Sequence, residues 1–292
     1  MRGLAAVTGE GERDLAGGRW WQSLVEERSP VDLKTDQPHS ARMYDYYLGG
    51  KDNFPADREA AEQALTASPN VATAARSSRA FMTRVVRFLA GEVGIRQFLD
   101  IGTGIPTSPN LHETVQSIAP DARVVYADND PIVLTHARAL LTSSPQGATV
   151  YLDADLRDPE RILAAPELRA TLDLSRPVAL SLMSIFHFIP DSDDPHGILR
   201  RLLDELPSGS YLVLSHGTGD VDPAVAAAAE AYRQRGIPTR LRSQAEVEGL
   251  FTGLDLIEPG VQLVHRWRPD GTIPAGLTDA QVSAYGGVGR KA

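Results

Sequence analysis

Short apolar runs alternate with helical patterns through the middle of the chain. The runs QFLDI (97–101), RVVYAD (123–128) and PVALSLMSIF (177–186) are almost continuously apolar, which is typical of strands buried on both faces. The segments LHETVQSIA (111–119) and IVLTHARALL (132–141) repeat apolar residues every three or four positions and predict helices. This alternation predicts an α/β fold built on a mostly parallel sheet with helices on both faces.

Further elements of the same kind follow. ATVYLDA (148–154) and GSYLVLSHG (209–217) predict two more strands, and HGILRRLLDEL (196–206) predicts a helix between the fourth and fifth strands. Toward the C-terminus, AAAAEAYRQR and SQAEVEGLF predict helices. We expect the last apolar segments, LDLIE (254–258) and VQLVHRW (261–267), to close the sheet as a hairpin-like pair.

The N-terminal part has a different character. Residues 1–38 show no sustained period and predict a flexible tail, with Trp20-Trp21 as a candidate for a short docked helix. Residues 39–92 predict a helical cap: Ser40 is a candidate N-cap, Gly49-Gly50 a stop signal, and Pro55 opens a second helix. Residues 93–292 then form the α/β domain.

Composition narrows the class of protein. The chain has 292 residues, 42% of them apolar, with a net charge of −9, which argues against a protein built to coat phosphate backbones. It has no cysteine, which excludes disulfides, thiolate metal sites and a cysteine nucleophile. No apolar run reaches the roughly 18–20 residues of a membrane span, and the N-terminus lacks a signal-peptide core. We therefore expect a cytoplasmic protein that does not bind membranes.

A glycine-containing loop follows the first predicted strand in FLDIGTGIPT (98–107). Gly102, Thr103 and Gly104 allow close approach of a ligand to the backbone. A dinucleotide loop would place a third glycine where Thr107 stands. A pyrophosphate would also be repelled by the carboxylate of Asp100, whereas an ammonium or sulfonium group would be attracted. By charge, S-adenosylmethionine fits this loop better than NAD does.

Polar residues also end the second and third strands. Asp128, followed by Asn129, can accept both hydroxyls of a ribose. Asp130, before a proline, is expected to start the next helix. Asp155 could accept from an adenine amino group, and Leu156 would supply a backbone N–H and apolar cover. A single aspartate at a strand end can equally cap the next helix. Polar residues at the ends of several successive strands are therefore better evidence for a cofactor site than any one of them alone.

The fourth strand ends in Ser184, with His187 three residues later. This position lies beside the expected reacting centre, and His187 is the best candidate for a general base. The alternative is a neutral histidine packed between its phenylalanine neighbours. His216, at the end of the fifth strand, carries the same two interpretations, with packing favoured. Residues 191–196 (DSDDPH) suggest a metal site, but a helix start at Asp194 is simpler, so no metal is expected.

Several of these motifs resemble known families. DIGTG, VVYADNDP, DADLRDP and SIFHFIPD resemble the successive motifs of class I S-adenosylmethionine-dependent methyltransferases. SARMYDYYLGGKDNFPADREAAEQ, with FLDIGTGIPT, DDPHGI and SYLVLSHGT, resembles a bacterial family of predicted methyltransferases formerly catalogued as a domain of unknown function. The resemblance spans residues 38–290. It implies S-adenosylmethionine as cofactor and a Rossmann-like, seven-stranded sheet with an antiparallel last strand.

The tyrosine-rich segment within that resemblance suggests a lid. Tyr44 and Tyr47 lie three residues apart and share a helix face, while Tyr46 points elsewhere. We expect Met43 and Tyr47 to line the cofactor, with aromatic faces attracting the sulfonium and Tyr44 as a second candidate catalytic residue. Arg42 and Lys51 would lie near polar groups. The alternative is that the tyrosines pack the helix onto the sheet.

Three functions fit these features. The first is methyl transfer from S-adenosylmethionine to an oxygen or nitrogen of a small molecule. The Asn/Asp-Pro-Pro-aromatic motif usual in enzymes that methylate nucleic-acid amino groups is absent, and Ser184 to His187 stand in its place, so no nucleic-acid partner is expected. The second is a cofactor-binding sensor or partner module without transfer activity. The third, an NAD-linked oxidoreductase, is disfavoured by Thr107 and Asp100.

Overall fold

A single mixed sheet forms the centre of the structure, a computed structural model that describes residues 33–140 and 143–292, with backbone alone for 136–140. The strand order is β3-β2-β1-β4-β5-β8-β6, and β7 also pairs with β8. Strands β1 to β5 are parallel, and β8 runs antiparallel to β5. The strands are β1 (Gln97–Ile101), β2 (Arg123–Asp128), β3 (Ala148–Asp153), β4 (Ala179–Met183), β5 (Tyr211–Gly217), β6 (Asp255–Leu256), β7 (Gln262–Leu263) and β8 (Ala284–Arg290).

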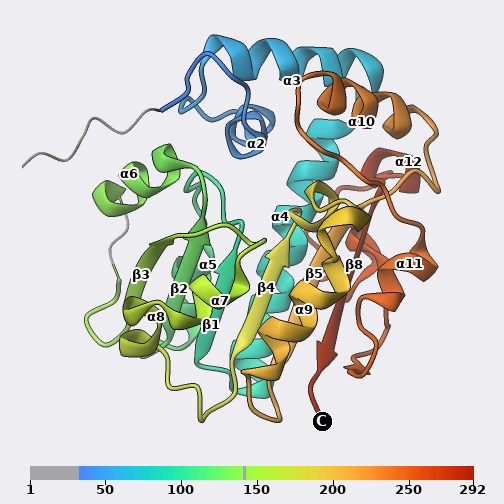
Figure 1. Cartoon of the computed structure of the whole chain (residues 1–292). Helices are drawn as coiled ribbons and strands as arrows, with labels where there is room; N and C mark the ends of the chain where they lie inside the picture. The colour runs from blue at the N-terminus through green and yellow to red at the C-terminus, as the bar shows by residue number, and fades with distance from the viewer. Residues whose placement is uncertain (1–32, 141–142) are drawn as a thin grey trace, which may run out of the picture. The chain divides into compact units, whose positions relative to one another are not determined.

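Helices cover both faces of this sheet (Figure 1). Side chains alternate across each strand, so Leu99 and Ile101 enter one apolar core while Phe98 enters the other. The first core receives α7 (Pro159–Ala164), α8 (Pro166–Thr171), α9 (Pro195–Asp204) and α11 (Gln244–Gly249). The second receives α4 (Val71–Arg87), the π-helical turn Phe88–Val93, α5 (Leu111–Ile118) and α12 (Asp279–Val282). The predicted α/β class and mostly parallel sheet are confirmed, and the sheet contains eight strands, seven of them in one row.

The C-terminal edge corrects one prediction. The segments expected to pair with each other shrink to β6 and β7, which both pair with β8 on the edge opposite β5. A line across the sheet therefore crosses at most seven strands. The sequence of β8, AYGGVGR, reads as a loop because of its glycines. Those glycines make room for neighbours: a Cβ on Gly286 would lie 2.7 Å from Phe81, and one on Gly289 would lie 2.9 Å from Phe251.

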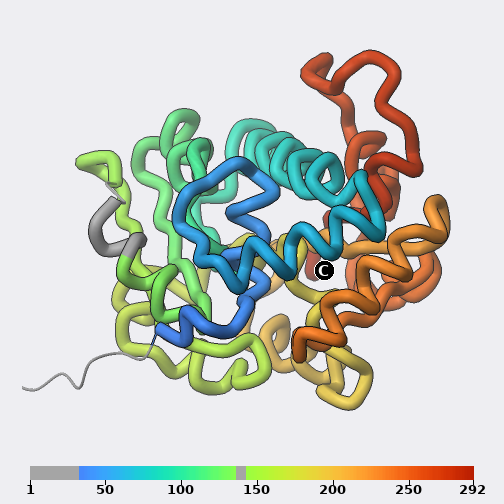
Figure 2. The backbone as a smooth tube through the Cα atoms, turned by 90° about the horizontal axis from the view of Figure 1, so that it is seen from above, coloured from blue at the N-terminus to red at the C-terminus, as the bar shows by residue number. Residues whose placement is uncertain are grey.

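Three helices lie beyond the carboxyl ends of the parallel strands: α2 (Ser40–Leu48), α3 (Pro55–Ala67) and α10 (Ala224–Gln234). Helix α10 contacts α3 although the two are far apart in sequence, and the view from above shows them side by side (Figure 2). The N-cap of α2 is His39, whose Nδ1 accepts from the amide of Ala41 at 3.3 Å, and not Ser40 as expected. Gly49 ends α2 in the left-handed conformation (φ 83°), as predicted.

The remaining helix, α6 (Pro131–Leu140), packs against β2 and β3. Residues Leu33–Ala292 form one compact unit, in which α4, expected within the cap, packs against the sheet. Of the predicted tail, residues 1–32, including Trp20-Trp21, lie outside the described residues. Among the residues the structure does describe, no helix has the length and apolar character needed to cross a membrane.

Candidate active site

A cavity of about 380 Å³ lies between the carboxyl ends of the strands and helices α2, α4 and α10. Its wall collects residues from β1, β2, β4, β5 and β8 and from the segment that follows β3. Among the residues predicted for the site, those that line it are Tyr44, Tyr47, Asp100, Gly102, Thr103, Gly104, Asp128, Asn129, Asp155, Leu156, Ser184 and His187. The sheet topology therefore brings the predicted strand-end residues together in one place, as expected for an α/β fold.

Met43 is the exception. Its side chain is fully buried in a cluster with Ala60, Ala61 and Ala75, where α2 packs on α3 and α4, and it does not line the cavity. Lys51 is exposed and lies away from the wall. Sequence spacing placed Met43 and Tyr47 on neighbouring turns, but the packing of α2 turns only the tyrosine side toward the cavity.

The glycine loop is shaped by contacts with the segment after β4. Gly102 has φ +74°, and a Cβ there would lie 2.5 Å from Cγ1 of Ile185. Gly104 has φ +68°, but the nearest atom to its Cβ position is 4.0 Å away. At position 102, both the positive φ angle and the close contact with Ile185 require a glycine. At position 104 only the φ angle favours glycine, because the space around it is open.

Asp128 holds this loop against β2. One carboxylate oxygen accepts from the amide of Gly104 at 2.8 Å and the other from the amide of Asp130 at 3.0 Å. Burial raises the pKa of Asp128, and the two backbone N–H groups oppose that rise. Each carboxylate oxygen retains a free lone pair for a ligand.

Asp130 ties the α2 region to the sheet. Its Oδ1 accepts from the amide of Ile132 at 2.9 Å, which starts α6 as predicted. Its Oδ2 lies 3.1 Å from Nε of Arg42. Arg42 also lies 3.6 Å from the carboxylate of Asp57 on α3. A buried ion-pair network thus fixes α2 over the carboxyl end of β2.

Asp100 is the carboxylate beneath the glycine loop. Burial raises its pKa to about 6, against the opposing charge of Arg79. Arg79 itself donates to the carbonyl of Thr107 and to that of Pro109 at 2.6 Å. The loop between β1 and α5 thereby holds a guanidinium at the cavity wall.

At the end of β3, Asp155 is held by two donors. Nδ2 of Asn129 donates to it at 2.9 Å, and the amide of Arg157 donates to it at the same distance. The pKa of Asp155 is lowered, because these bonds and the Arg157 charge outweigh the effect of burial. The carboxylate is therefore ionised at neutral pH. Leu156 follows it, buried in the wall.

The turn after β4 is strained. Ser184 has φ +54°, a left-handed conformation rare outside glycine. Its amide donates to the carbonyl of Ser215 at 3.2 Å and to the hydroxyl of the same residue at 2.9 Å. Strain of this kind gathers at functional sites, and here it turns the segment from Ser184 to His187 into the cavity wall.

His187 is neutral in this setting. Burial, together with the charge of Arg242, lowers its pKa to about 4, so it is a weaker base than an ordinary histidine. Its Nδ1 accepts a long hydrogen bond, 3.5 Å, from the amide of Gly217. The proton therefore lies on Nε2, for which no protein partner exists within the described residues. The ring lies 4.2 Å from that of Phe188.

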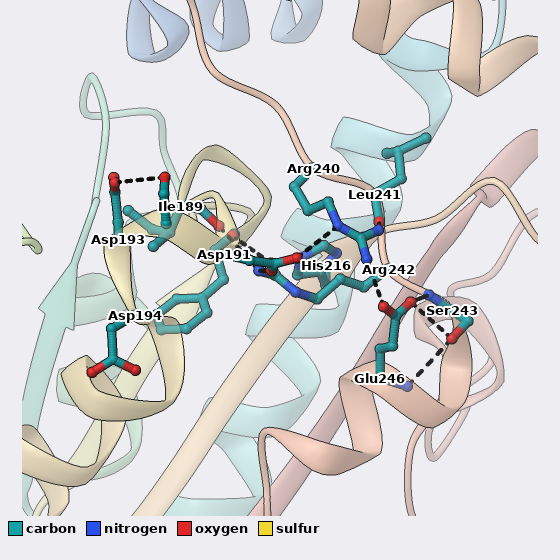
Figure 3. A network of polar contacts seen from close by, with 12 residues as sticks. Ile189, Asp191, Asp193, Asp194, His216, Arg240, Leu241, Arg242, Ser243 and Glu246 are labelled. Atoms are coloured by element: carbon teal, nitrogen blue, oxygen red, sulfur yellow. Dashed lines mark hydrogen bonds and ion pairs between the residues drawn. The ribbon is translucent and has the colours of Figure 1, made fainter.

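A buried arginine, Arg242, organises the loop after β4. Figure 3 shows it beside Asp191 and His216. Arg242 donates to the carbonyls of Phe186 (3.2 Å) and Ile189 (3.1 Å) and to the carboxylate of Asp191 (2.6 Å). It also lies 3.0 Å from Nε2 of His216. Since Arg242 can only donate, this Nε2 is an acceptor and the His216 proton lies on Nδ1, 2.8 Å from the carbonyl of Gly217. Both nitrogens of His216 are occupied, which fits the packing interpretation.

The acidic run after this loop is also accounted for. Asp191 contacts Arg240 and Arg242, and Asp193 contacts Arg157 at 2.8 Å. Asp194 is the N-cap of α9, as predicted. In the described part of the chain, no cluster of three or more histidine or acidic side chains could hold a metal ion.

The tyrosines of α2 both pack and line the cavity. The hydroxyl of Tyr44 donates to the carbonyl of Ala75 on α4 at 3.0 Å, and burial raises its pKa. The hydroxyl of Tyr47 lies 2.9 Å from that of Tyr232 on α10. Tyr46 points away, as expected, and bonds Glu62.

Sequence reasoning missed the far wall. It includes Arg79 from α4, Tyr126 from β2, and Tyr232, Ile237 and Leu241 from α10 and the segment after it. Tyr232 offered one signal, because it is the sole aromatic residue in the alanine-rich stretch AAAAEAYRQR. Nothing local marks the other four as wall residues.

Comparison with known proteins agrees with this geometry. A family model described as S-adenosyl methyltransferase matches residues 26–292. A DUF574 family protein from Streptomyces avermitilis MA-4680 is 54% identical over 89% of this chain and 100% of its own, with a TM-score of 0.87. A predicted methyltransferase from Thermobifida fusca YX is 42% identical over 90% of this chain and 98% of its own, with a TM-score of 0.83. No curated protein matches.

The family match covers the whole of the described chain, including the cap helices and every strand of the sheet. The resemblance seen in the sequence motifs is confirmed. The chain belongs to the S-adenosyl methyltransferase family, and its cofactor is S-adenosylmethionine.

Proposed function

We propose that this protein transfers a methyl group from S-adenosylmethionine to an oxygen or nitrogen of a small molecule. The observation that supports this most directly is the row of carboxylates at successive strand ends. Asp100, Asp128 and Asp155 all line one cavity beside the glycine loop. A ligand with hydroxyls and an ammonium group suits this row, whereas a pyrophosphate would meet three acids.

The residues present fit that cofactor. The free lone pairs of Asp128 would accept the two ribose hydroxyls. Asp155 and Leu156 would hold the adenine, and Asp100 would face the ammonium group. Gly102 and Gly104 leave the backbone open to close approach.

When bound, S-adenosylmethionine supplies a methyl group on a positively charged sulfur. The protein's part is to place an acceptor in line with that methyl group, and such positioning can supply about 7–11 kcal/mol of the barrier. Tyr44 and Tyr47 lie over the cavity from α2 and would attract the sulfonium through their ring faces by about 0.5–2 kcal/mol. The buried Arg42–Asp130 ion pair keeps these rings in place.

His187 has a narrower role in this proposal than the sequence suggested. A pKa of about 4 leaves it neutral at physiological pH and a poor proton acceptor. With its proton on Nε2, the ring can donate a hydrogen bond into the cavity. We assign it the orientation of the acceptor, so that the acceptor's lone pair faces the methyl group.

Calorimetry and transfer assays test the proposal together. The full chain should bind S-adenosylhomocysteine and should not bind NAD. Incubation with S-adenosylmethionine labelled in the methyl group and a set of small metabolites should yield labelled product. Lys51→Ala, on an exposed residue outside the wall, is the matched control and should behave as wild type. Binding of NAD alone would refute the proposal, and tight binding without transfer to any acceptor would favour a sensor.

A further inference from the structure

Most charged side chains of the cavity wall lie over β1, β2 and β3. Asp100 and Asp128 lie at the ends of β1 and β2, and Asp155 and Arg157 follow β3 and pair with each other. Arg157 also pairs with Asp193 and donates to the carbonyl of Phe188 at 3.4 Å. Arg79 comes from α4 but bonds the loop after β1. Among the residues described, the wall over β4, β5 and β8 has no Asp, Glu, Lys or Arg.

The strand order shows which part of the cavity each ligand would occupy. The sheet runs β3-β2-β1-β4-β5-β8, so the residues assigned to adenine, ribose and amino acid follow one another along its upper edge. The cofactor assigned above thus occupies the charged half. The half over β4, β5 and β8 remains for the acceptor.

This acceptor half is built from apolar and aromatic side chains. Helix α10 contributes Val225, Ala228 and Tyr232, the segment after it contributes Ile237 and Leu241, and the turn after β4 contributes Phe188. The rings of Phe188 and Tyr232 lie 5.7 Å apart at 31°. These two tilted rings, with aliphatic side chains around them, provide flat surfaces on which an aromatic ligand can stack.

Burial of an unpaired charge in such surroundings costs several kcal/mol. Arg157, which reaches the carbonyl of Phe188, is already paired with Asp155 and Asp193, so an ionised acceptor would find no unpaired charge of opposite sign there. The polar groups near it are neutral: the Nε2–H of His187 and the hydroxyls of Tyr44, Tyr47 and Tyr232. These groups can form hydrogen bonds with an uncharged hydroxyl or amine of the acceptor and so orient it.

We propose, on the basis of the function assigned above, that the methyl acceptor is an uncharged aromatic small molecule. Its ring lies between α10 and the turn after β4, and its nucleophilic oxygen or nitrogen is directed by His187. This half of the cavity sets substrate specificity, and the charged half binds the cofactor.

Three probes of the same size test the charge requirement. 1-Naphthol, 1-naphthoate and 1-naphthylmethylammonium share one ring system and differ in charge. Their affinities are measured by calorimetry on the full chain saturated with S-adenosylhomocysteine. We expect 1-naphthol to bind at least ten-fold more tightly than either charged analogue. Equal or tighter binding of a charged analogue, or binding of none of the three, overturns the proposal.

A pair of variants tests whether the acceptor binds in this half of the cavity. Val225 lines the cavity from the first turn of α10, whereas Ala226 is exposed on the same turn. Val225→Arg should weaken 1-naphthol binding at least ten-fold and leave S-adenosylhomocysteine affinity within two-fold of wild type. Ala226→Arg should change neither. If Val225→Arg binds 1-naphthol as wild type does, the acceptor half is wrongly placed. If wild type does not bind S-adenosylhomocysteine, the cofactor assignment itself fails, which is a separate result.

Discussion

The hydroxyl groups of Tyr47 and Tyr232 lie 2.9 Å apart, although 185 positions separate the two residues in the chain. Tyr47 comes from α2 and Tyr232 from α10, and both rings line the cavity. The pair joins the N-terminal cap to a helix inserted after the fifth strand. It closes the cavity on the side opposite the sheet.

Removal of this contact should loosen α2. Tyr47→Phe or Tyr232→Phe deletes one hydroxyl and should cost about 1 kcal/mol, the usual contribution of a hydrogen bond. The double variant should cost little more than either single variant, because both remove the same bond. Hydrogen exchange of the α2 amides measures the effect. Tyr46→Phe is the matched control, since that hydroxyl bonds Glu62 outside the cavity. Fully additive effects would show that the hydroxyls do not interact.

The raised pKa of Asp100 predicts a pH dependence of stability. The folded carboxyl has a pKa of about 6, above its ordinary value of 3.8, so the native state binds a proton more tightly than the unfolded chain. This group therefore destabilises the fold as pH rises from about 4 to about 6, by about 3 kcal/mol in all. Denaturant titrations should show Asp100→Asn gaining stability over wild type through that range. If the difference in free energy of unfolding between the two proteins did not change with pH, Asp100 would not be the group that titrates in this range.

The same carboxyl should couple cofactor binding to protons. An ammonium group beside Asp100 lowers its pKa, so binding near pH 6 releases a proton and weakens as pH falls below 6. Calorimetry of S-adenosylhomocysteine binding in two buffers of different ionisation enthalpy measures that release. Asp100→Asn should abolish it. An unchanged affinity between pH 5 and pH 7.5 in wild type would remove Asp100 from the ammonium site.

Asp128→Asn separates two roles of one carboxylate. Asp128 now accepts hydrogen bonds from the amides of Gly104 and Asp130. In the variant, the side-chain NH2 would face one of these donors and leave it unpaired, so the free energy of unfolding should fall by about 1–3 kcal/mol. If Asp128 also holds the ribose, S-adenosylhomocysteine affinity should fall by a comparable free energy. Thermal melts and calorimetry report the two quantities separately. Lost stability with full affinity would leave Asp128 as an anchor of the glycine loop alone.

The two glycines of the loop should respond differently to alanine. At Gly102 the new Cβ would clash with Ile185, so Gly102→Ala should destabilise by about 2–3 kcal/mol. At Gly104 the space is open, so Gly104→Ala should cost only the left-handed backbone strain of about 1–2 kcal/mol. Thermal melts compare them. Ile185→Ala, which removes the Cγ1 and Cδ1 atoms that would clash, should restore part of the loss in the Gly102→Ala background. Equal melting temperatures would contradict this packing.

Arg242 should act on His187 through position and charge. Arg242→Met removes the donors that hold the carbonyls of Phe186 and Ile189 and should destabilise by about 2–3 kcal/mol. It should also raise the pKa of His187 from about 4 toward its ordinary value, since the Arg242 charge helps to lower it. NMR titration of the His187 ring measures this. Arg240→Gln, on an exposed ion pair, should cost under about 1 kcal/mol. An unmoved His187 titration would reduce Arg242 to a packing role.

The sequence by itself determined the five parallel strands and the set of polar residues gathered at their carboxyl ends. Buried parallel strands are continuous apolar runs, and their carboxyl ends meet at one edge. Residues that follow successive strands, such as Asp100, Asp128, Asp155 and Ser184, were therefore placed together by their order alone. The absence of a third glycine at Thr107 was equally readable. These signals are local, because each needs only the strand that precedes it.

Only the tertiary structure decided the rest. From the sequence, the glycines of β8 are more typical of a loop than of a strand. The structure shows that they leave space for the side chains of Phe81 and Phe251. Met43 and Tyr47 share a helix, yet packing against α3 buries one and the Tyr232 contact brings the other to the cavity. The sequence marks His187 as a candidate base, and only the structure shows the burial and the Arg242 charge that lower its pKa. Each of these outcomes depends on a contact between segments far apart in the chain, and no local pattern encodes which distant surface a residue will meet.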